Sequence, residues 1–271
     1  GQRFALIGRN GAGKSTLMKV LMGKIVLDSG QVHCRKGLHI AGLPQDLSTQ
    51  YGETVFEDIL ARIKSDSSFL AAYTIHDFIL EDKKIALKGE HHDEHHLLEM
   101  IESFNQMLDI FELDLHARYQ GLSGGMKRRC ALIAALLQNP DVLCLDEPTN
   151  HLDIRAITWL ENYLLKFAGA VIFVTHDRYF LKAVSNNIIA LEQGNIRHYN
   201  QGYEKYLDER AAELAEFENE SDRLNHKLKA EEHWLQRGVT ARRKRNQGRL
   251  KALHDLRETI QKRQKTLGMP G

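Results

Sequence analysis

The residues best suited to chemistry begin with a glycine-rich stretch that matches the pattern G-x-x-x-x-G-K-[ST]. Its members are Gly8, Arg9, Asn10, Gly11, Ala12, Gly13, Lys14 and Ser15, followed by Thr16. Small residues let backbone N–H groups wrap phosphate oxygens, and the start of a following helix adds positive potential. Lys14 can reach the β- and γ-phosphates of a nucleotide, and the Ser15 hydroxyl can bind Mg²⁺. The stretch therefore predicts a Mg·ATP site.

A pair of carboxylates, Asp146 and Glu147, follows an apolar run at residues 142–145. Carboxylates at the end of a buried strand are costly unless a charge is nearby. Asp146 suits holding the water ligands of Mg²⁺, and Glu147 suits polarising an attacking water. Two acids after a strand can instead cap a helix, but the phosphate loop upstream favours the catalytic interpretation.

A second glycine-containing segment, Leu122-Ser123-Gly124-Gly125-Met126, precedes a helix that is expected to run to about residue 137. Ser123 can act as the N-cap of that helix. The two glycines can also expose the helix N-terminus to a phosphate and form a second anion site. The residues alone leave both interpretations open.

The elements that must position these residues follow from runs of apolar residues. Residues 4–7 form a short strand before the glycine loop, and residues 14–22 read as a helix after it. Residues 142–145 and 171–174 are continuous apolar runs, as in parallel strands buried on both faces. Because ligands bind outside the carboxyl ends of such strands, Gly8, Asp146 and His176 are expected to point to one place. Residues 188–199 resemble a closing hairpin.

The chain changes character after residue 203. Leucines and other apolar residues follow a spacing of three and four, which predicts two long antiparallel helices joined at about residues 238–248. Residues 203–232 hold ten acidic and five basic side chains, whereas residues 233–271 hold eleven basic and two acidic ones. The cluster Arg242, Arg243, Lys244 and Arg245 either contacts nucleic acid or solubilises the tip of the hairpin.

Together these motifs resemble the ATP-binding-cassette (ABC) family, in the family's order and over about residues 1–200. Residues 8–15 resemble the Walker A loop, 122–126 the signature motif, 142–147 the Walker B strand and 150–153 the D-loop. The resemblance implies roles for three further residues, which are Gln45 of the Q-loop, Asp153 of the D-loop and the switch histidine His176.

What the resemblance implies is a P-loop α/β cassette at residues 1–202, with a helical subdomain at about 46–138, and a helical-hairpin linker at 203–271. It implies catalytic roles for Glu147, His176 and Gln45, and Mg²⁺ ligation by Ser15, Gln45 and Asp146. In this family Ser123, Gly124, Gly125 and Asp153 serve the nucleotide of an opposing cassette. The partner is thus expected to be a second cassette of the same chain or, for a fragment, a second copy.

The sequence of residues 146–153 and 175–178 resembles that of the ABC-F group, and residues 232–246 are most like its Uup branch. The resemblance implies two cassettes in one chain, action on ribosomes through rRNA or tRNA contacts, and an N-terminally truncated fragment here. The alternatives are a DNA-acting ATPase and, less in keeping with a long basic coiled coil, a transporter motor subunit. Three scattered cysteines and no apolar run of about 18 residues predict a cytoplasmic protein without a membrane segment.

Overall fold

The computed structural model describes residues 1–43, 50–66, 78–81, 84–87, 95–192, 194–236 and 251–258. The chain divides into two compact units, Gly1–Tyr203 and Glu204–Gly271. The sequence places all of the nucleotide motifs in the first unit and the helical extension in the second.

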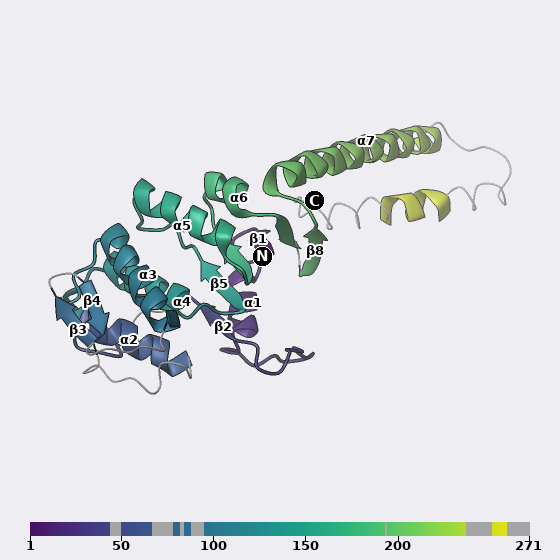
Figure 1. Cartoon of the computed structure of the whole chain (residues 1–271). Coiled ribbons are helices and arrows are strands. Elements are labelled where there is room, and N and C mark those ends of the chain that lie inside the picture. The colour runs from purple at the N-terminus through teal and green to yellow at the C-terminus, as the bar shows by residue number, and fades with distance from the viewer. Residues whose placement is uncertain are drawn as a thin grey trace. The chain divides into compact units, whose positions relative to one another are not determined.

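The first unit is built on a six-stranded sheet with the order β2-β5-β6-β1-β7-β8 (Figure 1). The strands are β1 (Arg3–Gly8), β2 (Ile40–Gly42), β5 (Val142–Asp146), β6 (Ala170–Val174), β7 (Asn187–Glu192) and β8 (Asn195–Tyr199). All neighbours pair in parallel except β7 and β8, which form the predicted hairpin. Since parallel strands share a direction, the ends of β1, β5 and β6 lie at one edge.

An apolar cluster beneath that edge joins the sheet to the first helix. Helix α1 (Lys14–Leu21) directs Met18 onto Leu6 of β1, Cys144 of β5 and Val174 of β6, all of which are buried. Residues from three strands therefore hold α1 in place, and its N-terminus follows directly from the glycine loop. This packing confirms the predicted order of strand, loop and helix.

The helical part of the first unit inserts between β2 and β5 in the sequence. Its elements are α2 (Val55–Asp66), β3 (Phe78–Glu81), β4 (Lys84–Leu87), α3 (His95–Phe111), the 3₁₀ turn η3 (Tyr119–Gly121) and α4 (Gly124–Leu137). Strands β3 and β4 form a separate antiparallel pair that the sequence analysis did not predict. Figure 1 shows this pair beside α3, away from β1. Helices α5 (Ile154–Lys166) and α6 (Arg178–Val184) follow β5 and β6.

The second unit contains most of the 34-residue helix α7 (Tyr203–Gln236) and a helical segment at residues 251–258. The Arg257 guanidinium donates to the Glu232 carboxylate at 2.7 Å, so the two helical segments are in contact. The predicted connection at residues 238–248, including Arg242 to Arg245, lies outside the described residues. No helix in the described part of the chain is long and apolar enough to cross a membrane.

Candidate nucleotide-binding site

The phosphate loop is a tight turn between β1 and α1, and its shape depends on Gly13. This residue is the N-cap of α1 and has φ +97°, a left-handed conformation that favours glycine. The Lys14 ammonium donates to the carbonyls of Gly8 at 2.8 Å and Arg9 at 3.1 Å, so it lies folded over the loop. Ser15 is half-buried in the first turn of α1, where backbone N–H groups are left without helical partners. The loop thus offers donors for an anion.

The second part of the site is the turn after β5. Asp146 is buried at the end of the strand, and Glu147 follows with φ +50°, an unfavourable conformation for a non-glycine residue. Its backbone N–H donates to the Val174 carbonyl at 2.8 Å, which fastens the turn to β6. The sheet thereby directs the Glu147 side chain toward the end of β6.

Glu147 and His176 are brought together as the sequence predicted. The His176 backbone N–H donates to Glu147 Oε2 at 3.3 Å, and His176 Nε2 lies 3.6 Å from Glu147 Oε1. His176 is exposed, whereas the Glu147 side chain is mostly covered. Beneath them the buried hydroxyls of Thr149 and Thr175 lie 3.3 Å apart and join the two strand ends. A carboxylate and an imidazole therefore face one position at the edge of the sheet.

The signature segment has the cap that the sequence analysis considered. Ser123 Oγ accepts a hydrogen bond from the Met126 N–H at 3.3 Å and begins α4. Capping does not exclude anion binding, because Ser123 and Gly124 are both exposed. A Cβ on Gly125 would lie 3.1 Å from the His151 Cβ, so the segment packs closely against the residues that follow Walker B.

Two arginines in α4 donate to backbone carbonyls around the site, and sequence reasoning missed them. Arg128 donates to the backbone carbonyl of Asp146 and to that of Glu147, the latter at 3.2 Å. Arg129 donates to the His151 carbonyl at 3.1 Å and to the Phe111 carbonyl at 2.9 Å. Consecutive basic residues in a helix usually indicate a solvated face. The only feature of the sequence that could have indicated their role is their position, one helical turn after the signature glycines.

Two other predicted residues have different outcomes. Asp153 caps α5 by accepting a hydrogen bond from the Ala156 N–H at 2.8 Å. The residue is exposed, and this bond directs its carboxylate to α5 and not to the phosphate loop of its own chain. Gln45 lies outside the described residues, and its predicted role as a catalytic residue and Mg²⁺ ligand stays a prediction.

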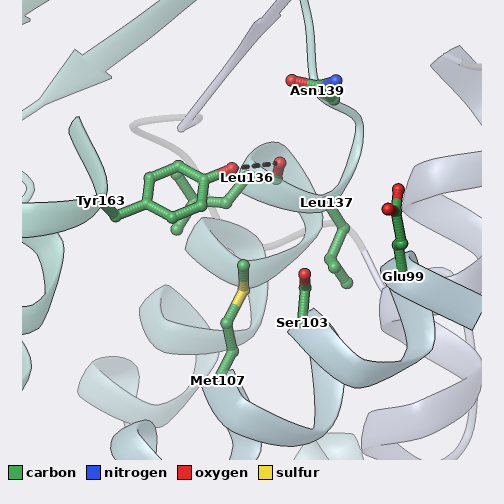
Figure 2. Close-up of a pocket in the computed structure, with 7 residues that line it drawn as sticks. All are labelled: Glu99, Ser103, Met107, Leu136, Leu137, Asn139 and Tyr163. Carbon is green, nitrogen blue, oxygen red and sulfur yellow. Dashed lines mark hydrogen bonds between the residues drawn. The ribbon is translucent and has the colours of Figure 1, made fainter. Parts of the chain in front are cut away.

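A cavity of about 220 Å³ lies between α3, α4 and α5, and Figure 2 shows its lining. Tyr163 borders it and donates to the Leu136 carbonyl at 3.1 Å, and burial raises the pKa of its hydroxyl to about 12. The lining shares no residue with the phosphate loop or the strand ends. The cavity is therefore separate from the phosphate loop and from the ends of β5 and β6.

The geometry agrees with the comparison to known families. A family model described as ABC transporter matches residues 1–150, and an extension model of the same description matches residues 189–269. The chain belongs to the ABC family. It is an ABC cassette ATPase, followed by the extension that the second model describes.

This cassette is similar to two named proteins of Escherichia coli (strain K12). It is 37% identical to ATP-binding protein Uup over 274 residues, which cover 98% of this chain and 43% of the relative. It is 32% identical to the energy-dependent translational throttle protein EttA, which it matches over 98% of its own length and 50% of the relative. The chain thus spans half or less of the length of these relatives.

The fold is also that of the ATP-binding cassette MJ0796, solved as a dimer in a post-hydrolysis state with ADP and Pi. The TM-score is 0.51 at 19% identity, over 74% of this chain and 87% of that one. This likeness supports the fold of the first unit.

Proposed function

We propose that this chain is one ATP-hydrolysing cassette of a pair that closes on ATP and acts on ribosomes. In this proposal the N–H groups of residues 8–16 hold the phosphates. Lys14 exchanges its two carbonyl partners for phosphate oxygens, which are stronger acceptors because they are charged. The folded-over lysine supports this role, since its ammonium already lies across the loop that would hold the anion.

The hydroxyl and carboxylate oxygens at the sheet edge fit Mg²⁺, which prefers oxygen ligands. This ion is usually bound by one or two carboxylates together with the phosphates of the substrate. Among the described residues, no group of three or more His, Cys, Asp or Glu side chains could hold a metal ion. The Ser15 hydroxyl and the buried Asp146 carboxylate would therefore hold the ion together with ATP, with Gln45 as a predicted third protein ligand. When bound, the ion neutralises charge on the phosphates.

Glu147 is the general base in this proposal, and His176 supports it. A carboxylate that accepts a hydrogen bond from the His176 N–H is fixed in orientation, so it can hold a water at a constant angle to the γ-phosphate. The adjacent imidazole can donate to the transferred phosphoryl group. The observation that supports hydrolysis is this pairing, because the Glu147 carboxylate, directly after the strand that ends in Asp146, lies 3.6 Å from the His176 imidazole.

The partner is proposed to be a second cassette, in the same chain or in a second copy. Ser123, Gly124 and Asp153 are exposed on this cassette and free to meet another surface. The dimeric form of the similar cassette MJ0796 supports such an arrangement. In it, residues 123–125 would complete the site of the opposing nucleotide, so the intact protein is the proper subject of assays.

The ribosome is the proposed target because EttA, which is similar along 98% of this chain, is named as a translational throttle. The predicted basic segment at residues 242–245 would meet RNA phosphates. The test is sedimentation of the intact protein with ribosomes. With ATP present, Glu147→Gln is expected to be trapped closed and to sediment with ribosomes, whereas Lys14→Ala, which loses nucleotide, is expected to stay in the supernatant.

Two results would overturn the ribosome proposal. One is an ATP-trapped Glu147→Gln protein that fails to sediment with ribosomes. The other is a protein that binds duplex DNA but is not displaced from it by ribosomes, which would favour the DNA-acting alternative that the basic segment also allows.

A further inference from the structure

A buried ion pair lies in the helical part of the first unit, away from the residues proposed for hydrolysis. Asp58 is fully buried in α2, and Arg62 lies one turn later with 8% of its surface exposed. Their Nε and Oδ2 atoms are 2.5 Å apart, and Arg62 Nη2 also donates to Oδ1 at 3.4 Å. Burial opposes the charged guanidinium, but the hydrogen bond and charge of Asp58 outweigh it and raise the pKa of Arg62.

Two other segments of the chain meet on this pair. Arg62 Nη2 donates to the Tyr119 hydroxyl in η3 at 3.0 Å. The Tyr51 N–H donates to Asp58 Oδ1 at 2.8 Å, and the Tyr51 ring centroid lies 4.6 Å from the guanidinium carbon. From α4, the Lys127 ammonium lies 5.4 Å from the centre of the Tyr119 ring. We call Tyr51, Asp58, Arg62, Tyr119 and Lys127 the Arg62 cluster.

The backbone around the cluster joins the same two segments. The Tyr119 N–H donates to the Glu53 carbonyl at 2.9 Å, and the Val55 N–H donates to the Ala117 carbonyl at 3.0 Å. Residues 53–56, which include the first two residues of α2, are therefore paired with residues 115–119, which lead into the signature segment. The Leu122 N–H in turn donates to the Tyr119 carbonyl at 3.2 Å, so η3 connects the cluster to Ser123.

A buried ion pair is weak evidence for stability, because desolvation offsets most of the attraction between the charges. Its best-attested use is to fix one arrangement among several that an apolar core would allow. Arginine suits that use here, since its planar fork binds a carboxylate in two places and stacks on aromatic rings. The contacts of Arg62 and Lys127 meet at Tyr119, which begins the turn three residues before Leu122.

We infer that Asp58, Arg62 and Tyr119 are positioning residues for the signature segment, fixing Ser123 to Gly125 relative to the chain that enters α2. The inference rests on the proposed function, in which that segment serves the nucleotide of the opposing cassette. Substitutions in the Arg62 cluster are therefore expected to slow hydrolysis at the opposing site and to leave nucleotide binding at Lys14 unchanged.

The test measures single-turnover hydrolysis in the intact protein with this cassette's own Glu147 changed to Gln, so that only the opposing site hydrolyses ATP, once in each closed protein. The main variant is Asp58→Leu with Arg62→Met, which removes both charges together and leaves neither one buried alone. Opposing-site turnover is expected to fall about tenfold or more, as for misplacement of a group by about 1 Å. The Kd of a fluorescent ATP analogue at the Lys14 site is expected to be unchanged. The melting temperature is expected to shift by only a few degrees, because the hydrogen bonds lost from Tyr51 and Tyr119 are offset by the desolvation that the ion pair no longer requires.

Conservative and control variants separate positioning from general damage. Tyr119→Phe removes one hydroxyl and keeps the ring, so a smaller fall is expected. Arg62→Lys keeps the charge without the fork, and partial activity is expected. Removing the ion pair of Arg210 and Glu213 in α7, whose atoms lie 2.8 Å apart, is the matched control and should leave turnover unchanged.

Each other outcome overturns the inference. A folded double variant with normal opposing-site turnover shows that the cluster only stabilises its own subdomain. A fall in turnover together with weaker binding at Lys14 shows general damage. Ser123→Ala, made in the same background, identifies which proposal failed. If it leaves opposing turnover intact, the paired-site proposal is wrong and the inference falls with it; if it slows turnover and the double variant does not, the inference alone is wrong.

Discussion

Arg128→Met should slow hydrolysis without weakening ATP binding. The Arg128 guanidinium donates to the carbonyls of Asp146 and Glu147, at the turn where Glu147 adopts φ +50°. Methionine keeps the aliphatic part of the side chain and removes both hydrogen bonds. No group that contacts the phosphate loop in the described structure is altered by this change.

The expected magnitude follows from the contacts that are lost. A hydrogen bond from a charged donor contributes about 1.5–3 kcal/mol, and Arg128 is only half-buried, so we take this range for its two bonds together and not for each of them. The left-handed turn at Glu147 costs roughly 1–3 kcal/mol, which the surrounding contacts must offset. Losing about 1.5–3 kcal/mol of support would reduce the population of correctly oriented Glu147 by about tenfold to a hundredfold.

The assay is single-turnover hydrolysis at saturating ATP in the intact protein, with the catalytic glutamate of the other cassette changed to Gln. The rate constant for Arg128→Met should fall by about tenfold to a hundredfold, and the Kd for ATP should change by less than about threefold. Arg129→Met is the matched control, because it removes the same type of guanidinium–carbonyl bonds from the same helix. Its contacts are with Phe111 and His151, not with Glu147.

Three results would refute the reasoning. The first is turnover of Arg128→Met equal to that of the wild type, which would mean that β5 and β6 hold the turn without help. The second is a loss of activity in Arg129→Met as large as that in Arg128→Met, which would assign the effect to α4 in general. A loss of activity that only matches the loss of folded protein, followed by circular dichroism, would also exclude a role in orienting Glu147.

The remaining predictions concern binding, thiols and salt. Lys14→Ala should weaken ATP binding by roughly tenfold to a hundredfold, measured by equilibrium titration, and an unchanged Kd would contradict its role. At pH 8 a maleimide should label exposed Cys34 and spare Cys144 and Cys130, because burial raises their pKa values to about 11 and about 12; labelling of all three in the folded protein would refute this. Since the unfolded chain ionises both buried thiols from about pH 9, the free energy of unfolding should fall above that pH, as urea titrations can check. Changing residues 242–245 to Gln should flatten the salt dependence of RNA binding by about 0.7–0.9 log unit per lost phosphate contact, and an unchanged slope would leave the segment without that role.

The parts of the fold that sequence predicted are those encoded by neighbouring residues. A glycine loop between a strand and a helix is local, and so is the hairpin of β7 and β8, which turns at Gly194 with φ +79°. The meeting of Glu147 with His176 is not local. It was still predictable, because parallel strands must end at the same edge of a sheet.

Other features could not be predicted because they depend on tertiary contacts. Strands β3 and β4 are mostly apolar runs of four residues each, too short for periodicity to distinguish a strand from part of a helix. Arg62 in α2 has the spacing of an ordinary helical pair with Asp58, and it is buried by tertiary contacts that include Tyr51 and Tyr119. Cys34, one of three scattered thiols, is exposed while the other two are buried.

Helix α4 is the element that joins these observations. Its first turn carries Gly124 and Gly125, which we propose to serve one nucleotide, and Arg128 one turn later holds the backbone beside the Glu147 that serves another. A hydrogen-bonded helix is stiff over so short a distance, so its first turn cannot shift far without moving that arginine. In the proposed pair, the Arg62 cluster positions the start of α4 at the opposing nucleotide. A shift of the signature segment there would then move Arg128 and, with it, the Glu147 turn at this cassette's own nucleotide. Two cassettes linked in this way would hydrolyse their nucleotides in a coupled manner.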